Sequence, residues 1–174
     1  MNIQAIARRL SSAEAAEIAE AAMVLPLVFM LLLGIVWFGR AFNIYSTIQQ
    51  AAQQGAITAA RATCVTCGND FPNNGEVQTA VDAVLKSSNL QASQIKASAN
   101  PGLISCPPPA PVGGCTKTAG NIWVCRTVRL NATQPFQCGS VVSFQYPFQF
   151  YLPFTSLNLQ QVVLSAQAQS RMEN

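Results

Sequence analysis

Hydrophobic residues are concentrated in one uninterrupted stretch near the N-terminus. Residues 21–39 read AAMVLPLVFMLLLGIVWFG and carry no charge. At about 1.5 Å per residue, a helix of this length crosses a hydrocarbon core of about 30 Å. The stretch ends in Trp37, Phe38, Gly39 and Arg40, which is typical of an interfacial anchor rather than of a signal-peptide cleavage site. We therefore predict a transmembrane helix, kinked at Pro26, which lacks the N–H of an intrahelical bond.

Beyond Arg40 the helical pattern continues, with small residues in adjacent pairs every four positions. A stripe of small side chains lets another helix or a sheet approach closely. Its partner is either the chain's own sheet or another subunit, and the pattern does not choose between them. Together with the membrane span it predicts one long helix from about Ser12 to Ala62. The stripe comprises Ala51, Ala52, Gly55, Ala56, Ala59 and Ala60.

The remainder of the chain predicts one short helix and a sheet. Valine and leucine recur at helical spacing between Gly75 and Ser87, and Asn73 or Asn74 stands at the N-cap position. From Ser93 the pattern favours strands separated by clusters of Pro, Gly and Asn. The expected fold class is α+β, with a small antiparallel sheet packed against the long helix. The predicted strands are Gln94–Ala99, Asn121–Leu130, Ser140–Tyr151 and Leu159–Ser170.

Composition and charge restrict the function. Charged residues make up 10% of the chain, and the net charge of +3 comes from basic residues that are scattered rather than clustered, which disfavours nucleic-acid binding. The sequence has no histidine, the commonest general base. The carboxylates beyond the membrane stretch form no recognisable catalytic pair. We therefore predict no enzyme activity, no cofactor and no metal. Those carboxylates are Asp70, Glu76, Asp82 and Glu173.

All six cysteines follow the hydrophobic stretch, and an even number in an exported region favours disulfides. Because Arg8 and Arg9 before the stretch are nearly balanced by Arg40 and Arg61 after it, the cysteines decide the orientation: the N-terminus lies in the cytoplasm and the rest in the oxidising compartment. Of the fifteen possible pairings, we expect the nearest neighbours. These are Cys64–Cys67, Cys106–Cys115 and Cys125–Cys138, the last across a hairpin that turns near Asn131 and Ala132.

Three other interpretations of these residues are less well supported. A redox-active Cys64-x-x-Cys67 motif lacks the βαβ pattern of a thioredoxin-like fold around it. A zinc site formed by Cys64, Cys67, Cys106 and Cys115 has only one pair at the close spacing usual for zinc ligands. Asn131-Ala-Thr133 matches a glycosylation acceptor, a match that we interpret as a coincidence.

Three glutamates, Glu14, Glu17 and Glu20, precede the hydrophobic stretch at intervals of three residues. They are either solvated residues of the first helical turns or residues with a specific partner. Glu20 lies at the edge of the membrane. A carboxylate at the centre of the bilayer costs about 2.5–3.5 kcal/mol on insertion scales, and the cost is smaller at the edge.

The run from Glu20 to Pro26, the leucine-rich span after it and the exit Trp37-Phe-Gly-Arg40 resemble the opening of TadE-like pseudopilins of the tight-adherence pilus system. Residues 141–154 and 162–173 resemble the closing pattern of the same family. The resemblance implies cleavage by a prepilin peptidase between Ala15 and Ala16, although the family favours glycine where Ala15 stands. It also implies that Glu20 pairs with the amino group that cleavage creates, which offsets part of the cost of burying either charge.

The resemblance implies a structural minor pseudopilin that takes part in assembly of a tight-adherence pilus and supports adhesion and biofilm formation. The expected parts are a cytoplasmic leader at 1–15, a transmembrane and rod helix at 16–62 and a periplasmic, disulfide-rich domain at 63–174. The expected partners are the inner membrane, other pilins or pseudopilins, the assembly machinery and the prepilin peptidase. One alternative is a membrane-anchored binding module or adhesin that uses its Cys106–Cys138 region. The other is an anchored thiol oxidoreductase with a reactive Cys64.

Overall fold

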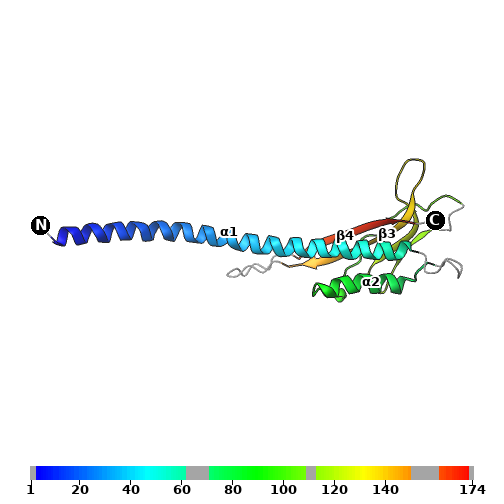
Figure 1. The fold of residues 1–174 in the computed structure, drawn as a ribbon, viewed down its shortest axis with the longest axis horizontal. Helices are drawn as coiled ribbons and strands as arrows, with labels where there is room; N and C mark the ends of the chain where they lie inside the picture. The colour runs from blue at the N-terminus through cyan, green and yellow to red at the C-terminus, as the bar shows by residue number, and fades with distance from the viewer. Residues whose placement is uncertain (1–2, 62–70, 109–112, 150–160, 173–174) are drawn as a thin grey trace. The chain divides into compact units, whose positions relative to one another are not determined.

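The computed structural model describes residues 3–61, 71–108, 113–149 and 161–172, with side chains from residue 16 onward. By its internal contacts the chain divides into two units, Met1–Phe42 and Asn43–Asn174. The fold is α+β with an antiparallel sheet, which confirms the predicted class (Figure 1). The elements are α1 (Ile3–Ala60), α2 (Asn74–Ser87), the 3-10 turn η1 (Ala92–Gln94), β1 (Gly114–Lys117), β2 (Trp123–Arg129), β3 (Cys138–Phe148) and β4 (Val162–Arg171).

Helix α1 is continuous from Ile3 to Ala60 and contributes to both units. It begins earlier than the predicted Ser12 and ends two residues before the predicted Ala62. The helix runs through Pro26 without a break in its secondary structure, and the predicted kink there stays a prediction.

Helix α2 begins at Asn74, one residue before the predicted Gly75, and ends at the predicted Ser87. The Asn73 side chain accepts a hydrogen bond from the Glu76 backbone N–H at 2.9 Å, which caps the first turn. Val77, Val81 and Leu85 lie on one face at helical spacing and are fully buried. Both the N-cap and the apolar face of the predicted helix are therefore confirmed.

The sheet has the strand order β1-β2-β3-β4, and every neighbouring pair is antiparallel. Three of the four predicted strands correspond to β2, β3 and β4. The strand predicted at Gln94–Ala99 is wrong, because this segment contains the end of η1 and a single bridge between Lys96 and Gln145. Strand β1 was not predicted, since its four residues show no alternation of apolar and polar side chains.

The main core lies between one face of the sheet and the two helices of the unit Asn43–Asn174. Figure 1 shows α2 and the part of α1 from residue 43 onward running beside the strands. Side chains at alternate positions of the strands point toward these helices. The largest fully buried residue is Phe144 of β3, and Ile48 of α1 and Leu85 of α2 pack in the same cluster.

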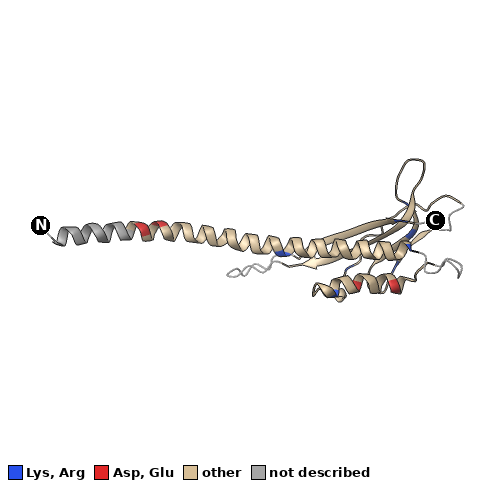
Figure 2. Ribbon diagram, viewed as in Figure 1, with Lys and Arg blue, Asp and Glu red and all other residues tan. Residues whose placement is uncertain are grey.

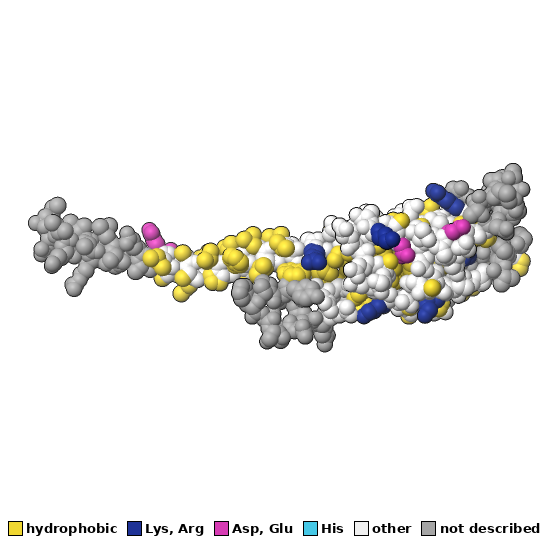
Figure 3. All heavy atoms as spheres, turned by 90° about the horizontal axis from the view of Figure 1, so that it is seen from below, with side chains coloured by type: hydrophobic (Ala, Val, Ile, Leu, Met, Phe, Trp, Pro, Cys, Tyr) yellow, Lys and Arg dark blue, Asp and Glu magenta, His cyan; other side chains and the backbone are white. Residues whose placement is uncertain are grey.

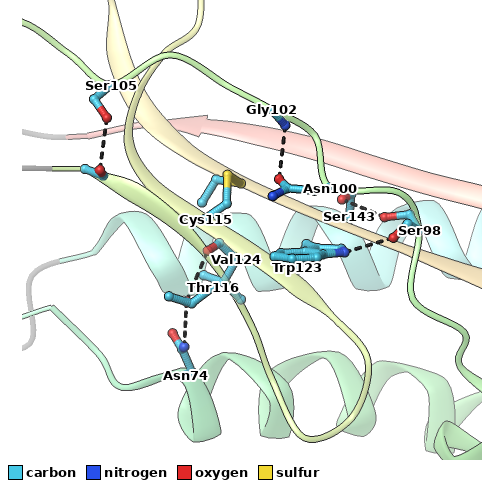
Figure 4. The surroundings of a disulfide bond; sticks show 12 residues. Asn74, Ser98, Asn100, Gly102, Ser105, Cys115, Thr116, Trp123, Val124 and Ser143 are labelled. Atoms are coloured by element: carbon cyan, nitrogen blue, oxygen red, sulfur yellow. Dashed lines mark hydrogen bonds between the residues drawn. A yellow bond between two sulfur atoms is a disulfide. The ribbon is translucent and has the colours of Figure 1, made fainter.

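The opposite face of the sheet is covered by the segment that connects η1 to β1. The Trp123 ring N–H donates to the Ser98 carbonyl at 2.9 Å, and the Ser98 and Ser143 hydroxyls lie 3.1 Å apart (Figure 4). Further along, the Cys106 N–H donates to the Thr127 carbonyl at 2.9 Å. A second, smaller cluster of Cys125, Val128 and Val141 is buried on this side. The middle of β3 is therefore buried on both faces.

Candidate membrane anchor and assembly segment

Between residues 21 and 39, α1 carries no charged side chain on any side and is largely exposed. Met23 is 81% exposed and Phe38 is 73% exposed. The helix from Ala16 to Ala60 contains a window long and apolar enough to cross a membrane, and none of that window is buried within the chain. Figure 3 shows hydrophobic side chains covering this segment. A helix that is apolar all round and has no protein partner is typical of a membrane span.

Charged residues bound this surface at both ends. Glu17 and Glu20 are exposed on one side, and no Asp, Glu, Lys or Arg stands between Glu20 and Arg40. Figure 2 shows the intervening part of α1 without charged side chains. The Arg40 guanidinium carbon lies 5.8 Å from the centre of the Trp37 ring, within the range of a cation–π contact. An aromatic residue paired with a cation suits the boundary between lipid and water.

The residues proposed for processing and assembly all lie on α1. Ala15, Ala16 and Glu20 stand in one uninterrupted helix, and Ala16 and Glu20 are exposed. Residues four apart on a helix lie on the same face, about 6 Å apart along the axis. An amino group created at Ala16 would therefore be one helical turn from the Glu20 carboxylate. These roles stay predictions.

The stripe of small residues lies in the core of the second unit. Ala51, Ala52, Ala56 and Ala59 are fully buried among residues of α2 and the sheet, and Gly55 is buried with them. Of the two partners considered for this stripe, the structure places the chain's own sheet and α2 against it. The face of α1 that these residues form is thus not available to another subunit.

The cysteine pairing differs from the nearest-neighbour expectation. The disulfides are Cys106–Cys138 and Cys115–Cys125, so the predicted Cys106–Cys115 and Cys125–Cys138 bridges are wrong. The antiparallel register of the sheet explains the difference, because Cys115 of β1 stands directly opposite Cys125 of β2. Figure 4 shows the surroundings of a disulfide at this position, with Cys115 labelled.

The same pairing removes the four-cysteine zinc site, because Cys106 and Cys115 are each bonded to another cysteine. Among the described residues no group of His, Cys, Asp and Glu could hold a metal ion. Cys64 and Cys67, together with the predicted bridge between them and the redox interpretation of their motif, lie outside the described residues.

The glycosylation-like triplet has a structural role instead. The Asn131 side-chain amide donates to the carbonyls of Thr133 at 2.8 Å and Pro135 at 3.0 Å, and its oxygen accepts from the Gln137 N–H at 2.6 Å. These bonds shape the connection between β2 and β3, which turns where the sequence predicts. The nitrogen that a glycan would modify is occupied by the chain itself.

Arg126 is a structural residue that sequence reasoning missed. Its guanidinium donates from Nη1 to the Asn74 side-chain oxygen at 2.5 Å and from Nη2 to the Pro72 carbonyl at 2.6 Å. Burial lowers the pKa of Arg126, since removing water from a cation disfavours its charged form. Asn74 also donates to the Thr116 hydroxyl at 2.8 Å, so the start of α2 is tied to both β1 and β2. No local sequence signal indicates these bonds, because the residues are far apart along the chain.

An exposed, uncharged helix of membrane-spanning length followed by a disulfide-bonded α+β unit fits a single-pass, membrane-anchored protein. Residues 15–56 match the family of TadE-like proteins, which confirms the resemblance seen at the N-terminal end. The match covers the exposed segment and most of the buried stripe, and it ends before the sheet. The resemblance of the C-terminal residues stays a prediction. No curated protein and no solved structure matches the chain.

Proposed function

We propose that this chain is a structural, non-enzymatic minor pseudopilin that takes part in assembly of a tight-adherence pilus, and thereby in adhesion and biofilm formation. The observation that carries the proposal is the coincidence of the TadE-like match at 15–56 with the exposed apolar part of α1. The apolar window within this matched region is not buried inside the chain, and such a surface is suited to lipid and to other anchored subunits.

The orientation follows from the disulfides. Two bridges in the unit Asn43–Asn174 support its location in the oxidising periplasm, because disulfides do not persist in the cytoplasm. The N-terminus is then cytoplasmic, and the inner membrane surrounds the segment between Glu20 and Arg40. The interfacial pair of Trp37 and Arg40 supports the periplasmic boundary at that point.

Residues 1–15 are proposed as a leader that a prepilin peptidase removes between Ala15 and Ala16. Cleavage converts a peptide nitrogen of the helix into an α-amino group one turn from Glu20. In a medium of low dielectric constant this pair offsets part of the desolvation cost of both charges. If the amine belongs to a neighbouring subunit, the same pair fixes the axial register between subunits.

Processing and oxidation are tested together by intact-mass analysis. The non-reduced protein is extracted from membranes of cells with and without their prepilin peptidase. The proposal predicts a mature chain that begins at Ala16 only when the peptidase is present, with all six cysteines oxidised. A full-length chain in both strains would contradict processing and would favour the anchored adhesin.

The role of Glu20 is tested with a matched variant on the same helix. Glu20→Ala and Glu17→Ala remove the same charge, and both residues are exposed in the isolated chain. The proposal predicts that Glu20→Ala reduces recovery of the protein with pilus components, whereas Glu17→Ala does not. Equal recovery of both variants and the unaltered chain would show that Glu20 has no part in assembly.

A further inference from the structure

The two edges of the sheet are protected to different degrees. Strand β1 has four residues and ends in Lys117, and β2 beside it is bulged between Cys125 and Val128. A short edge, a lysine and a bulge are the devices by which proteins prevent unwanted strand pairing. Strand β4, at the other edge, has ten residues, contains no proline and carries no charge before Arg171 (Figure 1). None of these three devices protects β4.

The pairing of β3 shows which backbone groups of β4 point outward. Gln145 of β3 exchanges two hydrogen bonds with Lys96, at 2.8 and 2.9 Å, so its N–H and C=O point away from β4. In an antiparallel ladder the residue opposite, Ser165, then points its own N–H and C=O away from β3. The Met172 N–H donates to the Cys138 carbonyl at 3.2 Å, so Met172 points toward β3, as the same alternation requires.

Pro147 agrees with this assignment. It lies within β3 opposite Val163, at a position where a proline would break a ladder bond if its nitrogen faced β4. By the alternation its nitrogen faces the β2 side of β3. The pairing of β2 with β3 does not extend that far, because its last pair in this direction is Trp123 with Ser143.

The outward groups of β4 therefore belong to Val163, Ser165, Gln167, Gln169 and, at its C-terminal end, Arg171. Within the described part of the chain, the one hydrogen bond to them is from the Gln49 side chain to the Ser165 carbonyl, at 3.3 Å. Gln167 and Gln169 are exposed. A row of backbone donors and acceptors with this two-residue repeat is complementary to another extended chain.

We propose that the edge of β4, which pairs with no other strand in the described part of the chain, binds an extended segment of a different membrane-anchored protein, which adds to the sheet as a fifth, antiparallel strand. Backbone pairing supplies the affinity, and the antiparallel arrangement is the more stable one per residue. From Val162 to Ser170 the exposed side chains beside this edge are glutamine, serine and valine, and the one charge, Arg171, lies at its C-terminal end. A partner strand with uncharged side chains therefore fits the stretch before Arg171 without burying an unpaired charge.

A second copy of this chain does not fit, an argument that rests on the proposed membrane anchor. Strand β4 runs in the same direction as residues 43–60 of α1. Gln49 bonds to Ser165 in the first half of β4. Ala59, further along α1, accepts a bond from Ser140, which pairs with Ser170 near the end of β4. Antiparallel pairing of two β4 strands would turn the Asn43 end of the second copy the opposite way. The chain segments that lead to the two proposed anchors would then leave from opposite ends of the paired strands.

A copy in the same orientation offers its β1 edge, which runs in the required direction but is only four residues long. The Thr118 N–H donates to the Ile122 carbonyl at 2.8 Å, so Thr118 and every second residue before it point toward β2. The backbone groups of Cys115 and Lys117 therefore point outward. Two outward residues, one of them lysine, pair poorly with the five of β4. The occupant is therefore a strand of another protein.

The experiment uses the full-length chain in membranes of its own host. The photo-crosslinking residue benzoylphenylalanine replaces Gln167 at the β4 edge or, as the control, Gln53, which is exposed on α1 in the same unit. The proposal predicts an adduct with another membrane protein from position 167 and not from position 53. Adducts with a second copy alone, or equal adducts from both positions, would overturn it.

A proline variant tests whether the adduct depends on backbone pairing. Gln169→Pro removes an outward N–H that β3 does not use, whereas Gln169→Ala keeps it. Loss of that bond and the clash of the ring with an added strand are expected to lower the adduct yield from position 167 about tenfold, with the alanine variant nearly unaffected. An equal yield from both variants, with the two disulfides intact, would contradict strand addition.

The order of the crosslinks provides a test that does not depend on the proline variant. Benzoylphenylalanine at Ser165 and at Gln169 is expected to label two sites of the partner in reverse sequence order, as an antiparallel strand requires. The same order in both chains, or scattered sites, would overturn the proposal. A chain that fails to be processed at Ala15 and yet gives this pattern would reject the pseudopilin function and retain the strand-binding edge.

Discussion

Gly55 of α1 lies so close to Val81 of α2 that a β-carbon at Gly55 would stand 2.7 Å from Val81 Cγ2. The same added atom would lie 3.4 Å from Val142 Cγ1 of β3. The first distance is much shorter than van der Waals contact, and the second is at the lower limit of ordinary contact. The absence of a side chain at Gly55 thus sets how closely α1, α2 and the sheet approach one another.

Gly55→Ala is therefore expected to destabilise the domain. Overpacking costs about 1–3 kcal/mol, while the better helix propensity of alanine recovers up to about 1 kcal/mol. We expect a net loss of about 1 kcal/mol in the free energy of unfolding. The measurement is urea unfolding of the full chain in detergent, followed by Trp123 fluorescence in a Trp37→Phe background. Gly39→Ala is the control, since nothing lies within 4 Å of an added β-carbon there; equal effects of the two substitutions would contradict the packing argument.

The two described disulfides should differ in their contribution to stability. Cys106–Cys138 closes a separation of 32 residues and Cys115–Cys125 one of 10. On the chain-entropy model these loops correspond to about 4 and about 3 kcal/mol. We expect the double serine variant of the first pair to unfold at a lower urea concentration than that of the second.

Peptide mapping under non-reducing conditions checks the pairing itself. Linked peptides containing Cys106 with Cys138, and Cys115 with Cys125, are expected from the purified protein. Recovery of Cys106 linked to Cys115 instead would show that the register of β1 against β2 is not the one described.

The Asn131 side chain should stabilise the β2–β3 connection through its three hydrogen bonds. Because each neutral bond contributes about 1 kcal/mol and the site is partly exposed, we expect Asn131→Ala to cost about 1–2 kcal/mol. Thr133→Ala is the matched control, since it also removes the glycosylation-like triplet but leaves all three Asn131 bonds in place. Similar thermal unfolding of the two variants would show that these bonds contribute nothing.

The elements that could be predicted from sequence are those with local causes. The bounds of α2 follow from its cap at Asn73 and from its apolar residues at Val77, Val81 and Leu85. The exposed apolar helix is equally local, because its length and lack of charge are properties of one segment. The family match falls on this same segment.

The features that could not be predicted depend on residues far apart in sequence. The nearest-neighbour rule for cysteines failed because the register of the sheet, rather than loop length, brings Cys115 opposite Cys125. The sequence predicts Lys96 in a strand, yet in the described part of the chain its backbone forms only one isolated bridge, with Gln145, beyond the Trp123 end of β2. The small-residue stripe correctly indicates close packing, but its partners Val81 and Val142 come from elements that a one-dimensional pattern cannot place.

The contact between Asn74 and Arg126 allows a prediction about pH. The Arg126 guanidinium is partly buried, and its Nε atom has no hydrogen-bond partner in the described part of the chain. Asn74→Asp places a carboxylate where the Asn74 oxygen now accepts the Nη1 bond. A hydrogen bond between two charged groups is stronger than one with a neutral acceptor. We expect a gain of about 1 kcal/mol in the free energy of unfolding near neutral pH.

The dependence of this gain on pH follows from the pKa of the new carboxyl group. Arg126 favours the ionised form, so the pKa of Asp at position 74 is lower in the folded chain than its unfolded value of about 3.9. The gain is then fully present above the unfolded pKa and is lost as the pH falls through the folded one. Urea unfolding of the variant and the unaltered chain between neutral and acidic pH measures the difference.

Asn73→Asp is the control that separates the ion pair from the helix dipole. It places a carboxylate at the N-cap of the same helix, where the Asn73 oxygen accepts from Glu76. Both variants gain from the positive end of α2, but only Asn74→Asp faces Arg126. The stability of Asn74→Asp should therefore exceed that of Asn73→Asp, and the excess should vanish when Arg126 is replaced by methionine in both. An excess that survives the Arg126→Met substitution would assign the gain to the helix terminus instead.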